Sequence, residues 1–258
     1  MATPTVFNSQ KFDRIVVFVM ENTDYSTAMS NSYMSNLATQ GALFTNYYSC
    51  QHPSYPNYLN LVAAQDFGST SDTSPSVIYG GRTIVDLFSD NSLSWKNYVE
   101  PNYMQNHHPL IHFNQIKTDS TMMANIVAST QFFTDWTART LPKYSLYTSC
   151  CVEGQTAGGV PSLTTFLNAI GGVSGIKDYA GTLVQIVYDE SGSKTACNAN
   201  YVYNLFLGTP VTAGCKITNT ATPYSVLRTI EDNFGLGSIG NAGNFDSKTA
   251  SVNQCWAS

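Results

Sequence analysis

Charged side chains are scarce in this chain of 258 residues: Lys, Arg, Asp and Glu make up 11% of the sequence, against about 25% in an average soluble protein. The formal net charge is −5, and no basic run is present, so the chain offers no electrostatic attraction for nucleic acid or for an anionic membrane. No apolar run approaches the roughly 20 residues of a membrane-spanning helix. We therefore expect neither a nucleic-acid partner nor a membrane span.

Three other patterns are missing. No Cys-x-x-Cys pair occurs among the six cysteines, so no zinc site of that type is expected. The opening Met-Ala-Thr-Pro lacks the basic and apolar regions of a signal peptide. An even cysteine count and low charge still suit an oxidising compartment, so we expect a mature secreted chain, with a cytosolic protein as the alternative. The lack of an Asn-x-Ser/Thr sequon argues against a glycosylated secretory route.

The cysteines allow a disulfide without fixing its partners. Cys197 and Cys215 bracket a short loop-strand-loop segment and could close it as a disulfide. The alternative is that the cysteines are unrelated buried thiols.

Apolar runs that alternate with helical patterns predict the fold. Strands are expected at residues 14–19, 43–47, 94–99, 144–148, 182–188 and 201–207. Helices are expected at residues 32–40, from residue 58 onward, and at 83–89, 134–140, 163–170 and 224–234. No linker or repeat interrupts the chain. We therefore expect a single domain, residues 1–258, with an α/β fold: a three-layer α/β/α sandwich around a central, mostly parallel sheet.

The last predicted helix, residues 224–234, carries Arg228, Glu231 and Asp232 opposite an apolar face. We interpret these charged residues as a solvated or structural face. Gly235 directly after the helix is typical of a C-terminal stop.

Polar residues follow the two most apolar strands. Glu21 and Asn22 come directly after the first strand, and Asp189 and Glu190 follow the strand at 182–188. Ligands of open α/β sheets bind at the carboxyl ends of the strands. Two such strands side by side would bring these four oxygen-bearing side chains together around a cation.

Ser54 is the candidate nucleophile. Pro53 and Pro56 stiffen the backbone around it, and a predicted helix follows, so Ser54 is expected just before a helix N-terminus, where an anion is favoured. Its hydroxyl could attack a phosphoryl group if a metal lowers its pKa. Asn57 could donate its amide to a phosphoryl oxygen. The alternative is that Ser54 is an N-cap or turn serine.

Several motifs occur in an order that resembles a known family. They are Val-Met-Glu-Asn after a strand, His-Pro-Ser-x-Pro-Asn-Tyr-Leu, Trp-x-x-Tyr-x-Glu, His-x-Pro, Tyr-Asp-Glu-Ser after a strand, and Tyr-Ser-Val-Leu-Arg-Thr-Ile-Glu-Asp-x-Phe-Gly-Leu. Together they span residues 14–242. The chain resembles the phosphoesterase family of acid phosphatases and phospholipases C, which belongs to the alkaline phosphatase superfamily. The resemblance implies an alkaline phosphatase-like fold.

The resemblance also implies roles for the site residues. Glu21, Asn22, Asp189 and Glu190 match the metal ligands, and Ser54 matches the nucleophile that forms a phosphoserine. The oxygen donors favour one hard divalent cation such as Ca²⁺, Mg²⁺ or Mn²⁺ over Zn²⁺.

Histidines complete the expected site. His107 matches a histidine near the phosphate and could protonate the leaving alkoxide, or it could simply line a polar loop. His52 is expected either to contact the phosphate or to orient the Ser54 loop. His108 is expected, with Asn57, at the substrate.

Two departures from the family pattern leave the activity open. The family's His-Asp pair is missing from residues 146–154, and Pro223 stands where the family has a histidine. The leading hypothesis is a metal-dependent phosphatase that acts on a small-molecule phosphomonoester, which the short chain favours. The alternatives are a phospholipase C-type diesterase and a catalytically weakened member that serves as a binding protein.

Overall fold

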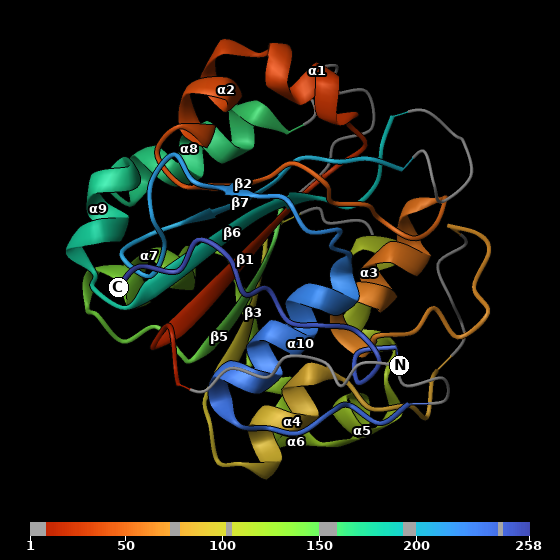
Figure 1. Ribbon diagram of the computed structural model, residues 1–258. Helices are drawn as coiled ribbons and strands as arrows, with labels where there is room; N and C mark the ends of the chain where they lie inside the picture. The colour runs from red at the N-terminus through yellow and green to blue at the C-terminus, as the bar shows by residue number, and fades with distance from the viewer. Residues whose placement is uncertain (1–8, 73–77, 102–104, 150–158, 193–199, 242–244) are drawn as a thin grey trace.

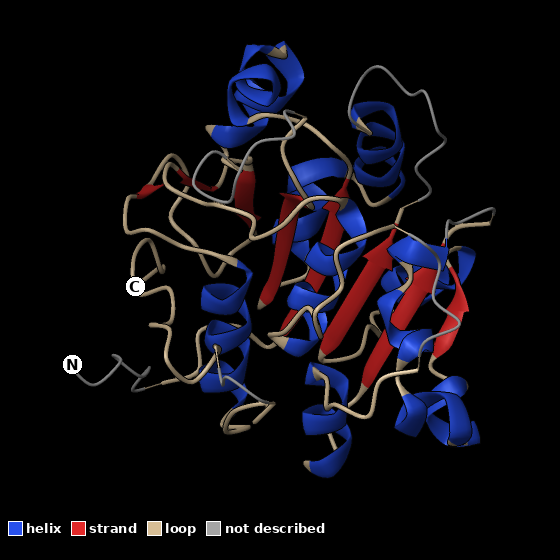
Figure 2. Ribbon diagram, turned by 90° about the vertical axis from the view of Figure 1, so that its right-hand side faces the viewer, coloured by secondary structure: helices blue, strands red, loops and turns tan. Residues whose placement is uncertain are grey.

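A central sheet organises the computed structural model, which describes residues 9–72, 78–101, 105–149, 159–192, 200–241 and 245–258 (Figures 1 and 2). Its strands are β1 (Arg14–Met20), β2 (Ala42–Phe44), β3 (Trp95–Val99), β4 (Ile126–Ala128), β5 (Tyr144–Thr148), β6 (Thr182–Tyr188), β7 (Asn204–Leu207) and β8 (Lys216–Ile217). They form one sheet in the order β4-β3-β5-β1-β6-β7-β2-β8. The pairings of β7 with β6 and β2 are antiparallel, and the other pairings are parallel.

Helices lie on both faces of this sheet (Figure 1). They are α1 (Tyr25–Ser30), α2 (Ser32–Ala38), α3 (Ser54–Ala63), α4 (Ile84–Asp90), α5 (Asn114–Thr118), α6 (Ser120–Met123), α7 (Thr130–Thr137), α8 (Val160–Ala169), α9 (Gly172–Asp178) and α10 (Pro223–Phe234), with 3-10 turns η1 (Gln105–His107) and η2 (Pro109–His112). Within the described ranges, no helix is long and apolar enough to cross a membrane.

Aromatic contacts show which helices cover which face. Side chains alternate between the two faces along a strand, so Tyr144 and Tyr147 of β5 point to opposite sides. The ring of Tyr147 packs against Phe166 of α8 with centroids 4.8 Å apart. The ring of Tyr144 packs against Phe88 of α4 at 5.4 Å, and Phe88 contacts Phe234 of α10 at 5.2 Å. The three-layer α/β/α architecture with a mostly parallel sheet is therefore confirmed.

Strand β1 lies between β5 and β6, and its position explains its composition. A central strand of a parallel sheet is covered on both faces, so its side chains form a continuous apolar run rather than an alternating one. Residues 15–20 are all buried. The register pairs Met20 with Tyr188, so the next residues of both strands, Glu21 and Asp189, leave the sheet at the same edge.

Some predicted boundaries are wrong. The second strand ends at Phe44 rather than Tyr47, and the strand expected at 201–207 begins only at Asn204. Helix α7 begins at Thr130, four residues earlier than predicted, and α3 begins at Ser54 rather than at Tyr58. Helix α10 ends as expected, because Gly235 adopts a left-handed conformation with φ of 65°.

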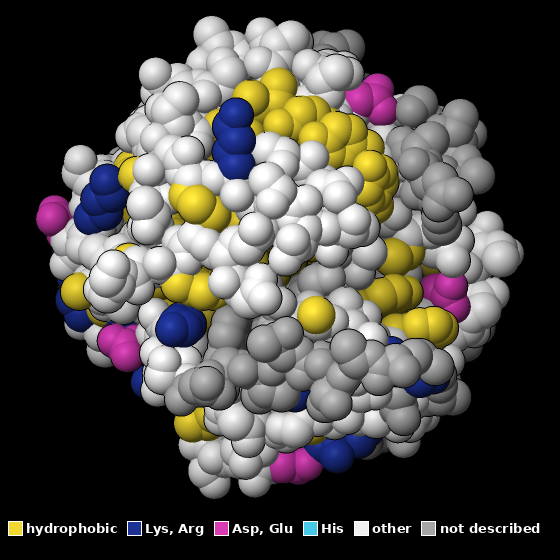
Figure 3. Space-filling view, viewed as in Figure 1, with side chains coloured by type: hydrophobic (Ala, Val, Ile, Leu, Met, Phe, Trp, Pro, Cys, Tyr) yellow, Lys and Arg dark blue, Asp and Glu magenta, His cyan; other side chains and the backbone are white. Residues whose placement is uncertain are grey.

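Charged side chains are spread singly over the face of the molecule in Figure 3, as the composition predicts.

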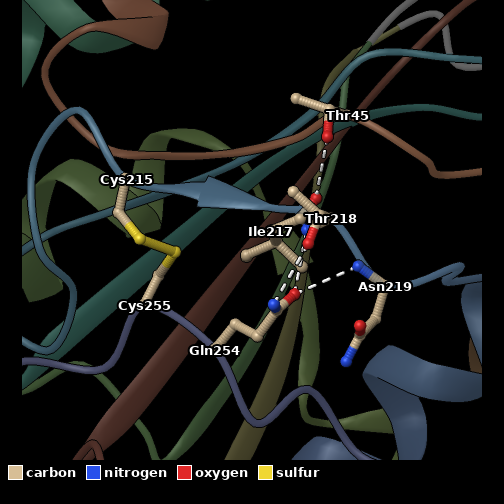
Figure 4. Close-up of a disulfide and its surroundings, with 7 residues drawn as sticks. All are labelled: Thr45, Cys215, Ile217, Thr218, Asn219, Gln254 and Cys255. Atoms are coloured by element: carbon tan, nitrogen blue, oxygen red, sulfur yellow. Dashed lines mark hydrogen bonds between the residues drawn. A yellow bond between two sulfur atoms is a disulfide. The ribbon is translucent and has the colours of Figure 1, made fainter.

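A disulfide joins Cys215 to Cys255, with Cα atoms 5.7 Å apart (Figure 4). The suggested Cys197–Cys215 pair is therefore wrong for Cys215, and Cys197 lies outside the described residues. The bridge fastens the C-terminal segment beside edge strand β8. Gln254 also holds this segment in place, because its side-chain oxygen accepts hydrogen bonds from the backbone N–H groups of Thr218 at 2.9 Å and Asn219 at 3.1 Å.

Loss of this disulfide is expected to lower the free energy of unfolding by about 4 kcal/mol, because a loop of this length restricts the unfolded chain. Its cysteines are 40 residues apart in sequence. Urea unfolding of Cys215→Ser, Cys255→Ser and the double variant checks this. If the two cysteines share one bond, the free energy of unfolding should fall equally in both single variants and in the double variant. A fall in the double variant equal to the sum of the two single ones would contradict the pairing.

Candidate functional site

Hydrogen bonds connect the polar loops that follow β1 and β6, at the carboxyl ends of the two strands. The backbone N–H of Asp189 donates to the carbonyl of Met20 at 2.9 Å, and that of Thr23 donates to the carbonyl of Glu190 at 3.0 Å. The Asp189 carboxylate accepts from the backbone N–H of Asn22 at 2.9 Å and of Glu190 at 2.7 Å. These bonds hold Glu21, Asn22, Asp189 and Glu190 on adjoining segments. The side-chain amide of Asn22 donates to Glu21.

Ser54 is the first residue of α3, not a residue before the helix as predicted, and Pro53 caps the helix in an extended conformation. Ser54 is 2% exposed. Its oxygen is 3.0 Å from Glu21 Oε1 and 3.3 Å from Glu190 Oε1. The structure therefore places the hydroxyl between two carboxylates from different strand ends, either of which can accept its proton.

A histidine contacts the far oxygen of each of these carboxylates. His52 Nδ1 lies 2.7 Å from Glu190 Oε2, and His107 Nε2 lies 3.2 Å from Glu21 Oε2. The His107 ring also stacks on Tyr58 of α3 with centroids 4.8 Å apart. Burial lowers the pKa of His107 to about 4, so at neutral pH the ring that lies against Glu21 is uncharged. Each histidine thus orients one carboxylate beside Ser54.

Asn57 shapes the loop in front of α3. Its side-chain oxygen accepts from the backbone N–H groups of Gln51 at 2.9 Å and Cys50 at 3.3 Å. Its amide nitrogen donates to the carbonyls of Gln51 at 2.8 Å and Pro53 at 3.2 Å. The side chain is fully buried. Its hydrogen bonds are thus made to the protein, and its contact with a substrate stays a prediction.

His108 occupies a buried position at the start of η2 and is 2% exposed. Burial, followed by the charge of His112, lowers its pKa to about 3. A neutral, enclosed imidazole is a weak binder of anions, and the predicted substrate contact of His108 stays untested.

Two residues that no sequence motif singles out connect the loops of the site. The Ser49 hydroxyl donates to the backbone carbonyl of Asp189. Asn200 accepts from the backbone N–H of Ser191 at 2.6 Å and donates to the carbonyl of Gln51 at 2.7 Å. Both join the β6 loop to the loop before α3. Neither stands out among the many Ser and Asn residues of the chain, because only the tertiary contacts give them a role.

Whether a metal ion fits this site depends on the charges of its carboxylates and on the atoms that they offer as ligands. Asp189 Oδ2 is buried without a hydrogen-bond partner. Burial, and then the negative charge of Glu21, raise the pKa of Asp189 well above its ordinary value. No group of three or more His, Cys, Asp or Glu side chains in the described part of the chain forms a ready-made metal cage. The carboxylates nevertheless repel one another, and their oxygen donors suit a hard divalent cation, which would relieve that repulsion.

The two departures from the family pattern have different outcomes. Residues 150–154, within the stretch where the His-Asp pair is missing, lie outside the described residues. Pro223 is the first residue of α10, a position where the missing N–H of proline costs no helical hydrogen bond.

Comparisons with known proteins agree with this architecture. The Phosphoesterase family model matches residues 19–237. The phosphate-repressible acid phosphatase of Penicillium chrysogenum is 28% identical over 89% of this chain and 60% of its own length. The phosphatidylinositol-3-phosphatase of Mycobacterium tuberculosis is 24% identical over 90% of this chain and 80% of its own length. This chain thus spans about three fifths of the fungal relative.

Among solved structures, an alkaline phosphatase superfamily protein from Vibrio parahaemolyticus superposes with a TM-score of 0.62 at 12% identity, over 92% of this chain and 69% of that one. A likeness at this identity shows the fold alone, and that fold is the one expected from the sequence. The family match covers most of the chain and includes both acidic strand ends and Ser54. The chain belongs to the Phosphoesterase family.

Proposed function

We propose that the chain hydrolyses phosphomonoesters with Ser54 as the nucleophile. The observation that carries this is the position of the Ser54 hydroxyl, 3.0 Å from Glu21 and 3.3 Å from Glu190 at a helix N-terminus. A carboxylate can take the hydroxyl proton, and the helix end favours the phosphate anion. The names of the relatives, an acid phosphatase and a phosphatidylinositol phosphatase, support the same reaction class.

The first half of the reaction transfers the phosphoryl group to the enzyme. Ser54 Oγ forms a bond to phosphorus, its proton passes to Glu21, and the bond between phosphorus and the leaving oxygen breaks. The leaving oxygen takes a proton from solvent and departs as an alcohol. In the second half the oxygen of a water molecule bonds to phosphorus, the bond between phosphorus and Ser54 Oγ breaks, and Ser54 takes back the proton held by Glu21 while phosphate leaves with the protons of the water. His107 and His52 keep the two carboxylates in place throughout.

Glu21, Asn22, Asp189 and Glu190 would hold a hard divalent cation. Bound there, it would supply positive charge to the phosphoryl oxygens and lower the pKa of the Ser54 hydroxyl. The unpartnered Asp189 Oδ2 and the mutual repulsion of the carboxylates support this assignment.

Chelation is expected to abolish hydrolysis of an aryl phosphate, and one of Mg²⁺, Mn²⁺ or Ca²⁺ is expected to restore it. The same ion should raise the melting temperature of the wild type, because a ligand that binds only the folded state stabilises it. Asp189→Asn should lose both effects. A bis-aryl phosphodiester serves as the competing substrate, and faster turnover of the diester would favour the phospholipase C-type alternative. Binding of the ion with no turnover of either ester would favour a binding protein.

We also propose that the protein works in an oxidising compartment. The Cys215–Cys255 disulfide supports this, because such bonds persist mainly in secreted and periplasmic proteins.

A further inference from the structure

Asp72 places a carboxylate at the N-terminal end of α3, directly beside Ser54. Its Oδ1 accepts from the backbone N–H of Tyr55 at 2.9 Å, and Tyr55 is the residue that follows Ser54 in the first turn of the helix. Because Pro56 has no N–H, the first three residues of α3 offer an anion the backbone N–H groups of Ser54 and Tyr55. A carboxylate of the protein itself therefore occupies one of these two donors.

The segment that carries Asp72 returns from the end of α3 to its beginning. Ala64 caps the helix in a left-handed conformation with φ of 53°. Asp66 then accepts a hydrogen bond at 2.9 Å from the side-chain amide of Gln51, which lies in the loop before α3. The ring of Phe67 stacks on that of Tyr79, with centroids 4.6 Å apart. These contacts hold the segment beside the loop before α3, so the fold itself brings Asp72 to the helix end.

The charge of Asp72 also acts on a histidine of the site. Burial lowers the pKa of His107 to about 4, and the negative charge of Asp72 opposes that shift. His107 Nε2 lies 3.2 Å from Glu21 Oε2, and Glu21 Oε1 lies 3.0 Å from the Ser54 hydroxyl oxygen. Asp72 is thus close enough to the site for its charge to act on a phosphate bound at Ser54.

The site differs from Asp72 in how firmly its groups are held. Asp189 is 1% exposed, its Oδ2 has no hydrogen-bond partner, and the Ser54 hydroxyl is one of the groups that its carboxylate faces. This buried oxygen points to a ligand at the site. Asp72, in contrast, is exposed, so its carboxylate can turn into water when another anion arrives.

We propose that Asp72 competes with the substrate: its carboxylate occupies the anion-binding end of α3, and the phosphoryl group displaces it to reach Ser54. This proposal rests on the proposed function and names a residue that sets the affinity of that site for phosphate. Two anions at one helix end repel each other. The carboxylate returns when inorganic phosphate leaves, and it thereby favours release of the product.

The test is the inhibition constant of inorganic phosphate during hydrolysis of phenyl phosphate. Asp72→Asn removes the charge but keeps a side-chain oxygen for the N–H of Tyr55, and asparagine caps helices about as well as aspartate. The inhibition constant and KM are expected to fall on the order of tenfold, because the repulsion between two anions is lost.

Asp119→Asn is the matched control. Asp119 is also an exposed aspartate at a helix N-terminus, where it accepts from the backbone N–H groups of Thr121 and Met122 in α6. This variant should keep the wild-type inhibition constant. An unchanged or larger inhibition constant in Asp72→Asn would overturn the proposal, because Asp72 would then act as a helix cap alone. A melting curve of Asp72→Asn that matches the wild type verifies that the variant is folded.

Failure of the proposed function would look different, because the wild type would then hydrolyse no phosphate ester. In that case calorimetry with inorganic phosphate still compares the wild type with Asp72→Asn. Tighter binding of phosphate to the variant supports the competition. Equal binding to the two proteins, or binding to neither, refutes it.

Discussion

Ser54→Ala is expected to lower kcat for phosphomonoester hydrolysis on the order of 10⁴-fold or more, because loss of a nucleophile removes the covalent route altogether. The hydroxyl is the group that lies between Glu21 and Glu190, and alanine leaves the first turn of α3 intact. Steady-state hydrolysis of an aryl phosphate measures the loss. Mass spectrometry of acid-quenched wild type should find phosphate on Ser54, and the variant should carry none.

A matched control exists in the same fold. Ser32 is the first residue of α2, the position that Ser54 has in α3, but it is exposed. Ser32→Ala should keep full activity and a normal melting curve. Activity of Ser54→Ala within tenfold of the wild type would mean that water attacks phosphorus directly, and would refute the phosphoserine route.

The acidic residues at the carboxyl ends of β1 and β6 could be predicted because the apolar runs before them are local sequence patterns. A strand buried on both faces must be apolar throughout, so residues 15–19 and 182–188 stand out in a chain with many polar residues. Glu21 and Asp189 interrupt those runs at corresponding points. The parallel register that pairs Met20 with Tyr188 then makes them neighbours.

The start of α3 was misread for a physical reason. Pro53 and Pro56 flank Ser54, and prolines usually break helices, so the predicted helix began at Tyr58. The first turn of a helix has no internal acceptor for its N–H groups, and proline is tolerated there. The backbone N–H of Tyr55 is instead capped by the carboxylate of Asp72 at 2.9 Å. A partner 17 residues away in sequence cannot be recognised from the sequence alone.

The burial of the charged face of α10 could not be predicted from the sequence either. A helical period places Arg228, Glu231 and Asp232 opposite the apolar stripe, which is compatible with a solvated or a structural face. In the structure Glu231 is fully buried, and so is Asp246 of the C-terminal segment. Both carboxylates accept from the backbone N–H of Ile239, at 3.1 Å and 2.7 Å. Only the path of the C-terminal segment turns this face into a buried one.

The second large expected effect is a decrease in the free energy of unfolding as the pH rises, and its cause is Glu231. Burial, followed by the hydrogen bond and negative charge of Asp246, raises the pKa of Glu231 from 4.5 to about 10. Arg228 Nη1, 3.6 Å from its Oε2, offsets this only in part. Folding therefore takes up a proton at neutral pH. The stabilisation that this proton gives is complete at a pH below the pKa of Glu231 in the unfolded chain. It is lost as the pH rises toward the pKa of Glu231 in the folded protein, at about 1.4 kcal/mol per pH unit.

Glu231→Gln should remove this loss, because an amide keeps a donor toward Asp246 and an acceptor for the N–H of Ile239 without a titrating proton. Free energies of unfolding from urea titrations between about pH 5 and about pH 9 should diverge, with the variant close to the wild type at the acidic end and increasingly more stable at the alkaline end. Asp90→Asn, which alters an exposed carboxylate paired with Arg82, should follow the wild-type curve. Parallel curves for the wild type and Glu231→Gln would show that Glu231 is ionised in the folded protein. Divergence would instead mean that the contact between α10 and the C-terminal segment is strongest in acid, whatever the pH optimum of the chemistry at Ser54.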